Sequence, residues 1–150
     1  RGDLAATTPP EYLARFVECE VTTPHMSTWG ADGYSPVWLD EANDWVYPHY
    51  DAAARRMVRL ADRHPAADGV LARALNQAAR ELLLGQSSDW AFSMTTGAHA
   101  EYAVARIRSH VVAFLDLDRQ IRSGDVNTDW LADLESRNNL FPDIDYQIYS

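Results

Sequence analysis

The chain has 150 residues, 47% of them hydrophobic, so it is long enough to bury one continuous core as a single domain over residues 1–150. Thirteen basic residues against 22 acidic ones give a formal net charge of -9, which disfavours binding to nucleic acid or to anionic membranes. The single cysteine, Cys19, excludes an internal disulfide framework, and no long apolar run predicts a membrane span, so we expect a cytoplasmic protein.

The N-terminal part of the sequence is predicted to be mostly irregular. Residues 1–10 resemble a linker that ends in two prolines, which suit the opening of a short helix over "EYLARFV". A loop follows from about Glu18 to Asn43, where prolines and glycines interrupt regular structure. Such a long connection is typically functional or disordered, and its aromatic content argues against disorder. Because the chain does not begin with Met, we expect it to continue a longer protein.

Four further helices are predicted from apolar residues that recur at helical spacing. The first covers 43–64 with Asn43 as its N-cap, and the second covers 66–86 and is buried on more than one side. An interruption, "SSDWAFSMTTG", precedes the longest helix at about 98–122. A short helix starts near Thr128, and the tail "LFPDIDYQIYS" is extended, because its proline excludes a helix. The fold class is therefore all-α: an antiparallel helical bundle of about four to five helices, with a long aromatic loop and an extended C-terminal tail.

Aromatic rings are concentrated in the loop and at the start of the helix that follows it. Residues 27–50 contain three tryptophans and three tyrosines. Trp29 and Trp38 lie in the loop, and two interpretations stay open for them. The rings either pack the loop onto the bundle, or present flat faces that stack on the C–H face of a pyranose sugar. Trp45 and Trp130 lie at predicted helix starts and are interpreted as core anchors.

Other side chains form few patterns that indicate chemistry. The five histidines show no HExxH or HxH spacing and have no partner cysteines, so we expect no metal site and no cofactor. No GxSxG motif and no glycine-rich phosphate loop is present. Asp89, in "QSSDWAF", follows a strongly apolar helix. It either bonds locally to Ser87 and Ser88, or lies at the rim of a pocket and accepts hydrogen bonds from ligand hydroxyls.

Four segments, in order, resemble the C-terminal helical domain of glycoside hydrolase family 57 proteins of the 1,4-α-glucan branching enzyme type. They are "STWGADGYSPVWLDEANDWVYPH", "RALNQAARELLLGQSSDWAFSMTTG", "YAVARIRSHVVAFLDL" and "NNLFPDIDYQIY". The resemblance extends from about Leu13 to Tyr149, which covers nearly the whole chain. Four separate matches in one order are far more specific than any single short motif.

The resemblance implies a retaining glycosyl transfer, in which an α-1,4-glucan chain is cut onto a catalytic Glu and passed to a 6-hydroxyl to form an α-1,6 branch. In such enzymes both catalytic acids belong to an N-terminal distorted (β/α)7 barrel, whose motifs are absent here. This segment alone is therefore expected to be inactive and to hold no catalytic residue. Trp29 and Trp38 match two tryptophans that form aromatic walls for the glucan, and Asp89 matches a polar residue near the same mouth. The implied partners are an α-glucan substrate and the barrel.

Alternatives to a branching enzyme stay open. The family also contains 4-α-glucanotransferases and α-amylases, which this segment does not fully separate from branching enzymes. A second alternative is a free-standing, non-catalytic helical module that binds glucan or a protein partner through the aromatic loop. A third is a structural bundle whose rings are all internal.

Overall fold

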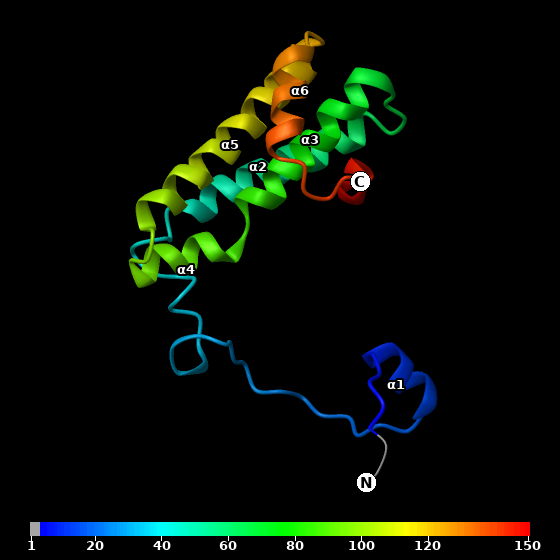
Figure 1. Cartoon of the computed structure of the whole chain (residues 1–150), viewed down its shortest axis with the longest axis vertical. Helices are drawn as coiled ribbons and strands as arrows, with labels where there is room; N and C mark the ends of the chain where they lie inside the picture. Colours follow the sequence, from blue (N-terminus) through cyan, green and yellow to red (C-terminus); the bar gives the residue numbers. More distant parts are fainter. Residues whose placement is uncertain (1–3) are drawn as a thin grey trace.

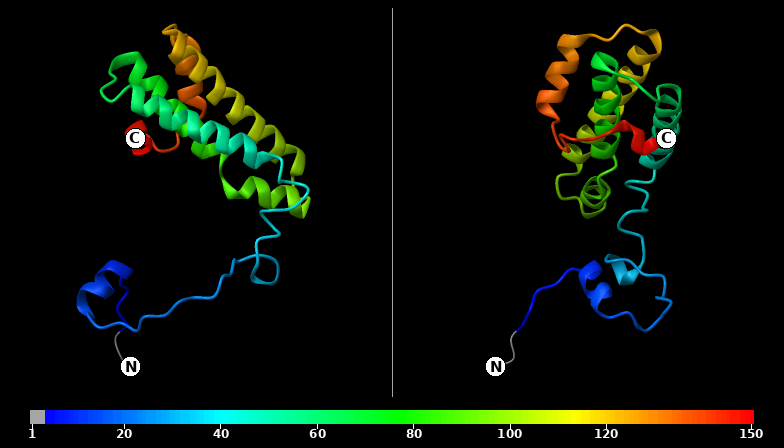
Figure 2. Two further views of the ribbon diagram at one scale, coloured as in Figure 1. Left: turned by 180° about the vertical axis from the view of Figure 1, so that it is seen from behind. Right: turned by 90° about the vertical axis from the view of Figure 1, so that its right-hand side faces the viewer.

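The computed structural model describes residues 4–150 and shows a helical bundle with an N-terminal arm (Figure 1). The helices of the bundle are α2 (Val46–Arg63), α3 (Gly69–Gly85), α4 (Ser88–Thr96), α5 (Ala100–Ser123) and α6 (Thr128–Arg137). The arm carries α1 (Pro9–Arg15), which buries no residue and lies apart from the bundle in both views of Figure 2. Two short 3-10 turns are η1 (Ala31–Gly33) and η2 (Tyr146–Tyr149). The predicted all-α class is confirmed.

α3 is the central helix of the bundle. It packs along α5 and also contacts α2, α6 and η2 (Figure 1). Its buried residues occupy several faces: Ala74, Leu75, Gln77, Ala78, Ala79, Arg80, Glu81, Leu82 and Gly85. The prediction that this helix is buried on more than one side is therefore confirmed. Around it, Met57 and Leu60 of α2 and Phe114 and Leu117 of α5 complete the main hydrophobic core.

The long amphipathic helices follow the predicted pattern, but their starts differ from the expectation. α2 begins at Val46 with Trp45 as its N-cap residue, so the predicted N-cap role of Asn43 is wrong. Pro48 lies in the first turn, where a backbone N–H would have no helical acceptor, so it does not break the helix. α5 ends at Ser123 and is followed by Gly124, whose φ of 71° places it in the left-handed conformation that commonly terminates helices.

Two segments expected to be irregular contain helical structure. The predicted interruption after α3 forms the nine-residue helix α4, which buries Ala91 and Met94 and ends at Gly97 in the left-handed conformation. The C-terminal tail is not extended throughout, because Tyr146–Tyr149 forms the turn η2. Among residues 4–150, no helix combines the length and the apolar character that crossing a bilayer requires.

A buried polar cluster lies between α3, α5 and the end of α6, and Glu81 is its centre. Glu81 is fully buried and accepts hydrogen bonds from Gln77 Nε2 at 2.7 Å and from Asn138 Nδ2 at 2.8 Å on Oε1. Its Oε2 lies 2.7 Å from Nδ1 of His110, which is also buried. Because each buried polar group here has a partner, the cluster fixes the relative positions of the three elements.

The C-terminal tail is held to the bundle by hydrogen bonds along its length. Arg80 on α3 donates to the backbone carbonyls of Leu140 at 2.5 Å and Phe141 at 3.0 Å. Further along, the backbone N–H of Tyr146 donates to Asn76 Oδ1 at 2.9 Å, and the buried Tyr146 hydroxyl donates to the His64 carbonyl at 2.5 Å. The tail therefore closes over α3 and reaches the end of α2.

Candidate functional site

The aromatic loop before α2 has a defined backbone conformation. The Thr28 N–H donates to the Gly33 carbonyl at 2.5 Å, and the Thr28 hydroxyl donates to the Tyr34 carbonyl. The turn between them includes Gly33, whose φ of 83° strongly favours glycine. The Trp38 N–H then donates to the Ser35 carbonyl at 2.9 Å. These bonds fold the loop into consecutive turns that set the directions of its side chains.

Trp29, Trp38 and Phe92 form an aromatic cluster between the loop and α4. The Trp29 ring centroid lies 6.3 Å from that of Trp38 and 5.7 Å from that of Phe92, both in tilted arrangements that favour aromatic contact. Trp29 nevertheless remains 81% exposed, whereas Trp38 is half-buried. A Cβ atom on Gly30 would lie 2.7 Å from Val37 Cγ2 and 3.1 Å from Trp38 Cζ3. Gly30 is therefore required for the loop to pack closely behind the Trp38 ring.

A buried asparagine connects the aromatic loop to α4. Asn43 is fully buried, and its Nδ2 donates to Thr95 Oγ1 at 2.7 Å and to the Val37 carbonyl at 3.1 Å. Its Oδ1 accepts from the Asp40 N–H at 3.0 Å, and Thr95 Oγ1 also donates to the Val37 carbonyl at 2.8 Å. We call Asn43 and Thr95 the loop bracket. It fixes the backbone next to Trp38, and so it positions that ring.

A pocket of about 510 Å³ opens beside Trp38. It is lined by Trp38, Tyr47, Tyr50, Asp51, Gln86, Ser87, Ser88 and Ala91, which come from the loop, from α2 and from the junction of α3 with α4. The Tyr47 hydroxyl donates to the Trp38 carbonyl, and the Tyr47 and Tyr50 rings meet edge to face at 6.2 Å. Burial, with a smaller effect of Tyr47, raises the pKa of Tyr50 to about 12. Burial also raises the pKa of Tyr47. At neutral pH both side chains are therefore uncharged hydroxyls and cannot act as bases.

Asp89 lies in the first turn of α4, close to this pocket but outside its lining. It is exposed, and its Oδ2 accepts a hydrogen bond from Ser87 Oγ at 3.0 Å. Ser87 itself lines the pocket. The structure thus shows the local bond that one interpretation expected, while the role of Asp89 toward a ligand stays a prediction.

The remaining candidate residues are distributed over the bundle. Trp130 is half-buried and packs against the main hydrophobic core. Trp45 is half-buried and packs against a smaller cluster formed by Val46, Met94, Ala103 and Ile107. Both positions agree with their interpretation as core anchors. Within residues 4–150, no group of three His, Cys, Asp or Glu side chains is arranged to hold a metal ion.

Several residues of this region were not identified from the sequence. Phe92 lies in the segment predicted to be an interruption, and Tyr50 lies within the helix predicted over 43–64. Gln86 is the last residue of the helix predicted over 66–86. All three come together because α2, α3 and α4 meet at the loop. Local sequence patterns do not predict such a tertiary contact.

The chemistry available here suits a neutral ligand rich in hydroxyl groups. Trp38 Nε1 is buried without a hydrogen-bond partner among residues 4–150, so this indole can offer a ligand its ring but not its N–H. Tyr and Ser hydroxyls, the Gln86 amide and the Asp51 carboxylate supply donors and acceptors around it. Aromatic faces combined with a few polar groups are typical of small-molecule pockets.

Comparison with known proteins identifies the family. Residues 49–149 match the family model described as "1,4-alpha-glucan branching enzyme, C-terminal". The chain is 36% identical over 139 residues to the 1,4-α-glucan branching enzyme TK1436 of Thermococcus kodakarensis. That alignment covers 86% of this chain but only 20% of the relative. The chain therefore spans about a fifth of the length of this curated relative.

Solved structures show the same fold. The GH57-type branching enzyme of Pyrococcus horikoshii matches with a TM-score of 0.80 and 34% identity, over 95% of this chain and 28% of that chain. TK1436 of Thermococcus kodakarensis, solved with glucose and additives, matches with a TM-score of 0.80 and 32% identity, over 95% and 27%. The α-amylase AmyC of Thermotoga maritima matches with a TM-score of 0.76 and 35% identity, over 99% and 27%. By its sequence and its fold, the chain belongs to the family of C-terminal domains of GH57-type 1,4-α-glucan branching enzymes.

Proposed function

We propose that this chain is the C-terminal part of an α-1,4-glucan branching enzyme and supplies an aromatic wall to its active-site cleft. The observation that carries the proposal is Trp29, which remains 81% exposed while it contacts Trp38 and Phe92 beside an open pocket. An indole held in that way offers a rigid apolar face to a sugar ring. Membership of the branching-enzyme family supports α-glucan as the ligand.

The proposed partner is an N-terminal (β/α)7 barrel of the same protein, which would hold both catalytic acids. The exposed apolar side chains of the arm support a covering partner: Tyr12, Leu13, Phe16 and Val17 are each at least 48% exposed. A group of apolar side chains of this kind is normally covered by another protein surface. In this proposal the chain alone is inactive.

The proposed contribution of Trp29, Trp38 and Asp89 is to bind the glucan and to keep water from the glycosyl intermediate. Stacking on the rings buries the C–H faces of the sugars, while Asp89 accepts hydrogen bonds from hydroxyls near the same mouth. With water excluded, the intermediate transfers to the 6-hydroxyl of a glucan more often than it is hydrolysed. The product would be a branched storage glucan of the glycogen type.

A cytoplasmic location is part of the same proposal. Cys19 is a free thiol and is exposed. An exposed, unpaired thiol suits a reducing compartment, where thiols are kept reduced.

The match to the α-amylase AmyC supports one alternative, in which the same domain serves a hydrolase or another α-glucan transferase. In a hydrolase, the aromatic wall would bind α-glucan without favouring transfer. Branching and hydrolysis of amylose distinguish the two, because branching creates α-1,6 linkages without creating new reducing ends.

The test uses the complete enzyme that contains this domain, with Trp38→Ala and Trp29→Ala compared with the control Trp130→Phe. Trp130 packs at the main core, away from the aromatic cluster. We expect both alanine variants to form fewer α-1,6 branches on amylose and to release relatively more reducing ends, while the control behaves like the parent. Unchanged branching in Trp38→Ala and Trp29→Ala would refute the aromatic-wall role. A parent enzyme that only hydrolyses amylose would instead favour the amylase alternative.

A further inference from the structure

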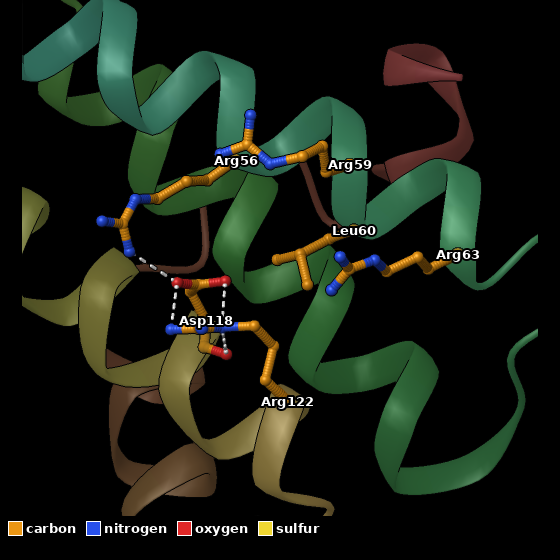
Figure 3. Close-up of a pocket in the computed structure, with 6 residues that line it drawn as sticks. All are labelled: Arg56, Arg59, Leu60, Arg63, Asp118 and Arg122. Atoms are coloured by element: carbon orange, nitrogen blue, oxygen red, sulfur yellow. Dashed lines mark hydrogen bonds and ion pairs between the residues drawn. The ribbon is translucent and has the colours of Figure 1, made fainter.

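A second pocket, lined mostly by arginines, lies between α2 and α5. It has a volume of about 270 Å³ and is lined by Arg56, Arg59, Leu60, Arg63, Asp118 and Arg122 (Figure 3). Arg56, Arg59 and Arg63 recur at spacings of three and four residues on α2, which places them on one face of the helix. Asp118 and Arg122 lie one turn apart on α5. The pocket shares no residue with the aromatic pocket beside Trp38.

The single carboxylate of this pocket, Asp118, forms ion pairs with two of the four arginines. The Asp118 side chain is 4% exposed and lies 2.9 Å from Arg56 Nη1 and 3.0 Å from Arg122 Nη2. Arg122 Nε also donates to Asp118 Oδ1 at 3.1 Å. This triad joins α2 to α5 and balances only part of the positive charge.

Arg59 and Arg63 are the two arginines of the pocket that do not bind Asp118. Within residues 4–150, neither forms an ion pair or a side-chain hydrogen bond. Figure 3 shows the Arg63 side chain extended beside Leu60, and dashed lines that join Asp118 only to Arg56 and Arg122. The six lining residues thus carry four positive charges and one negative charge, in a chain whose net charge is -9.

Packing alone does not account for this arrangement. Like charges on one helix face repel each other, and the Arg56–Asp118–Arg122 triad would join the helices without Arg59 and Arg63. The planar guanidinium group has several N–H donors in fixed directions and can donate two parallel hydrogen bonds to two oxygens of one phosphate. An anion with two negative charges would neutralise most of the excess.

We propose that this pocket binds a small phosphate-bearing anion, held by Arg59 and Arg63 and by those donors of Arg56 and Arg122 that do not bind Asp118. The floor is Leu60, which is 1% exposed, so a bound anion would be partly shielded from solvent. The volume suits an inorganic phosphate, a pyrophosphate or a hexose monophosphate, and is below the roughly 300 to 1,000 Å³ typical of pockets for drug-sized ligands. The proposal is independent of the aromatic wall.

The experiment is isothermal titration calorimetry on the purified chain at constant ionic strength. The ligands are inorganic phosphate, pyrophosphate, a hexose monophosphate and the same hexose without phosphate. The variant is Arg59→Gln/Arg63→Gln, because glutamine supports a helix about as well as arginine. The control is Arg15→Gln/Arg108→Gln, which changes the net charge equally but lies outside the pocket. Far-ultraviolet circular dichroism checks folding, and the two single variants serve if the double variant is misfolded.

We expect at least one phosphate ligand to bind the wild type, with binding at least about tenfold weaker in the pocket variant and within about twofold of wild type in the control. Tighter binding of the hexose monophosphate than of phosphate and pyrophosphate would identify a phosphorylated sugar as the ligand; the reverse order would identify a free phosphate. The proposal is overturned if no phosphate ligand binds, if the unphosphorylated hexose binds equally well, or if both double variants lose affinity to the same extent.

Discussion

The hydrogen bonds of the loop bracket predict how much the free energy of unfolding should fall in Asn43→Ala. The substitution removes the Nδ2 bonds to Thr95 Oγ1 and the Val37 carbonyl, and the Oδ1 bond to the Asp40 N–H. A contact at 3.4 Å to the Ala91 carbonyl is too long to add much. At about 1 kcal/mol of net stability for each of three hydrogen bonds, the expected loss is about 2 to 3 kcal/mol. The Val37 carbonyl keeps Thr95 as a donor, which holds the loss near the lower value.

The loss should appear both in the whole domain and locally at the loop. Urea unfolding gives the free energy of unfolding, and hydrogen exchange gives the local stability of the Trp38 amide, which bonds to the Ser35 carbonyl. Asn139→Ala is the matched control, because Asn139 is exposed. Thr95→Val should cost about 1 to 2 kcal/mol, since it also removes the donor to Val37. The two substitutions share one hydrogen bond, so together they should cost less than the sum of their separate effects.

A small effect of Asn43→Ala would refute the role of the loop bracket. If Asn43→Ala changes the unfolding free energy by less than about 0.5 kcal/mol, as a typical surface substitution does, and leaves Trp38 amide exchange unchanged, the bracket does not hold the loop. If only the exchange at Trp38 accelerates, the loop opens separately from the bundle. In that case the bracket still positions the ring, but it does not belong to the cooperative core.

Two further predictions concern the buried cluster and the pocket tyrosine. Glu81→Gln replaces one carboxylate oxygen, an acceptor, with an NH2 donor that faces the donors of Gln77, Asn138 or His110. Urea unfolding should therefore show a loss of about 2 to 3 kcal/mol, and an unchanged value would contradict a central role for the carboxylate. The folded-state pKa of Tyr50, about 12, lies above the ordinary tyrosine value of 10.0. Its neutral form therefore contributes stability that is complete below pH ~10 and is lost as the pH rises through ~12. The shift corresponds to at most about 3 kcal/mol, which solvent screening of this half-exposed group reduces to about 1 kcal/mol. Tyrosinate absorbance measures the pKa of Tyr50, and unfolding at alkaline pH measures the stability. Between pH ~10 and ~12, the stability of Tyr50→Phe should fall by less than that of the parent. An identical pH profile in the two proteins would contradict this role of Tyr50.

The long helices could be predicted from the sequence because their periodicity is local. The apolar residues of α5, such as Ile107, Phe114 and Leu117, recur at helical spacing and are buried as that spacing predicts. α4 could not be found in that way, because it is short and buries only Ala91 and Met94. Its position depends on contacts with α5 and on the loop bracket, which are tertiary features.

The candidate site was also predictable only where its residues are close together in the sequence. Trp29 and Trp38 are close in sequence, and the ring density around them pointed to this loop. Asn43 looked like a helix cap because Asn is a preferred cap residue, but its partner Thr95 lies 52 positions further along the chain. No single-sequence pattern indicates such a distant partner. The pocket residue Gln86 was missed because it is a neighbour of Trp38 only in the folded chain.

The tryptophans differ in how far they are buried and in the hydrogen bonds that their indoles form. Trp45 and Trp90 are half-buried, and their Nε1 atoms donate to the carbonyls of Ala42 at 3.2 Å and Leu84 at 2.8 Å. Trp29 has most of its surface in water, although burying a large apolar ring is favourable. Its neighbour Trp38 is fixed by a buried bracket that packing alone would not require. Fixing a ring before a ligand binds lowers the entropy that is lost on binding. These features support the proposed binding role of the loop, and the interpretation in which every ring is internal does not account for the exposure of Trp29.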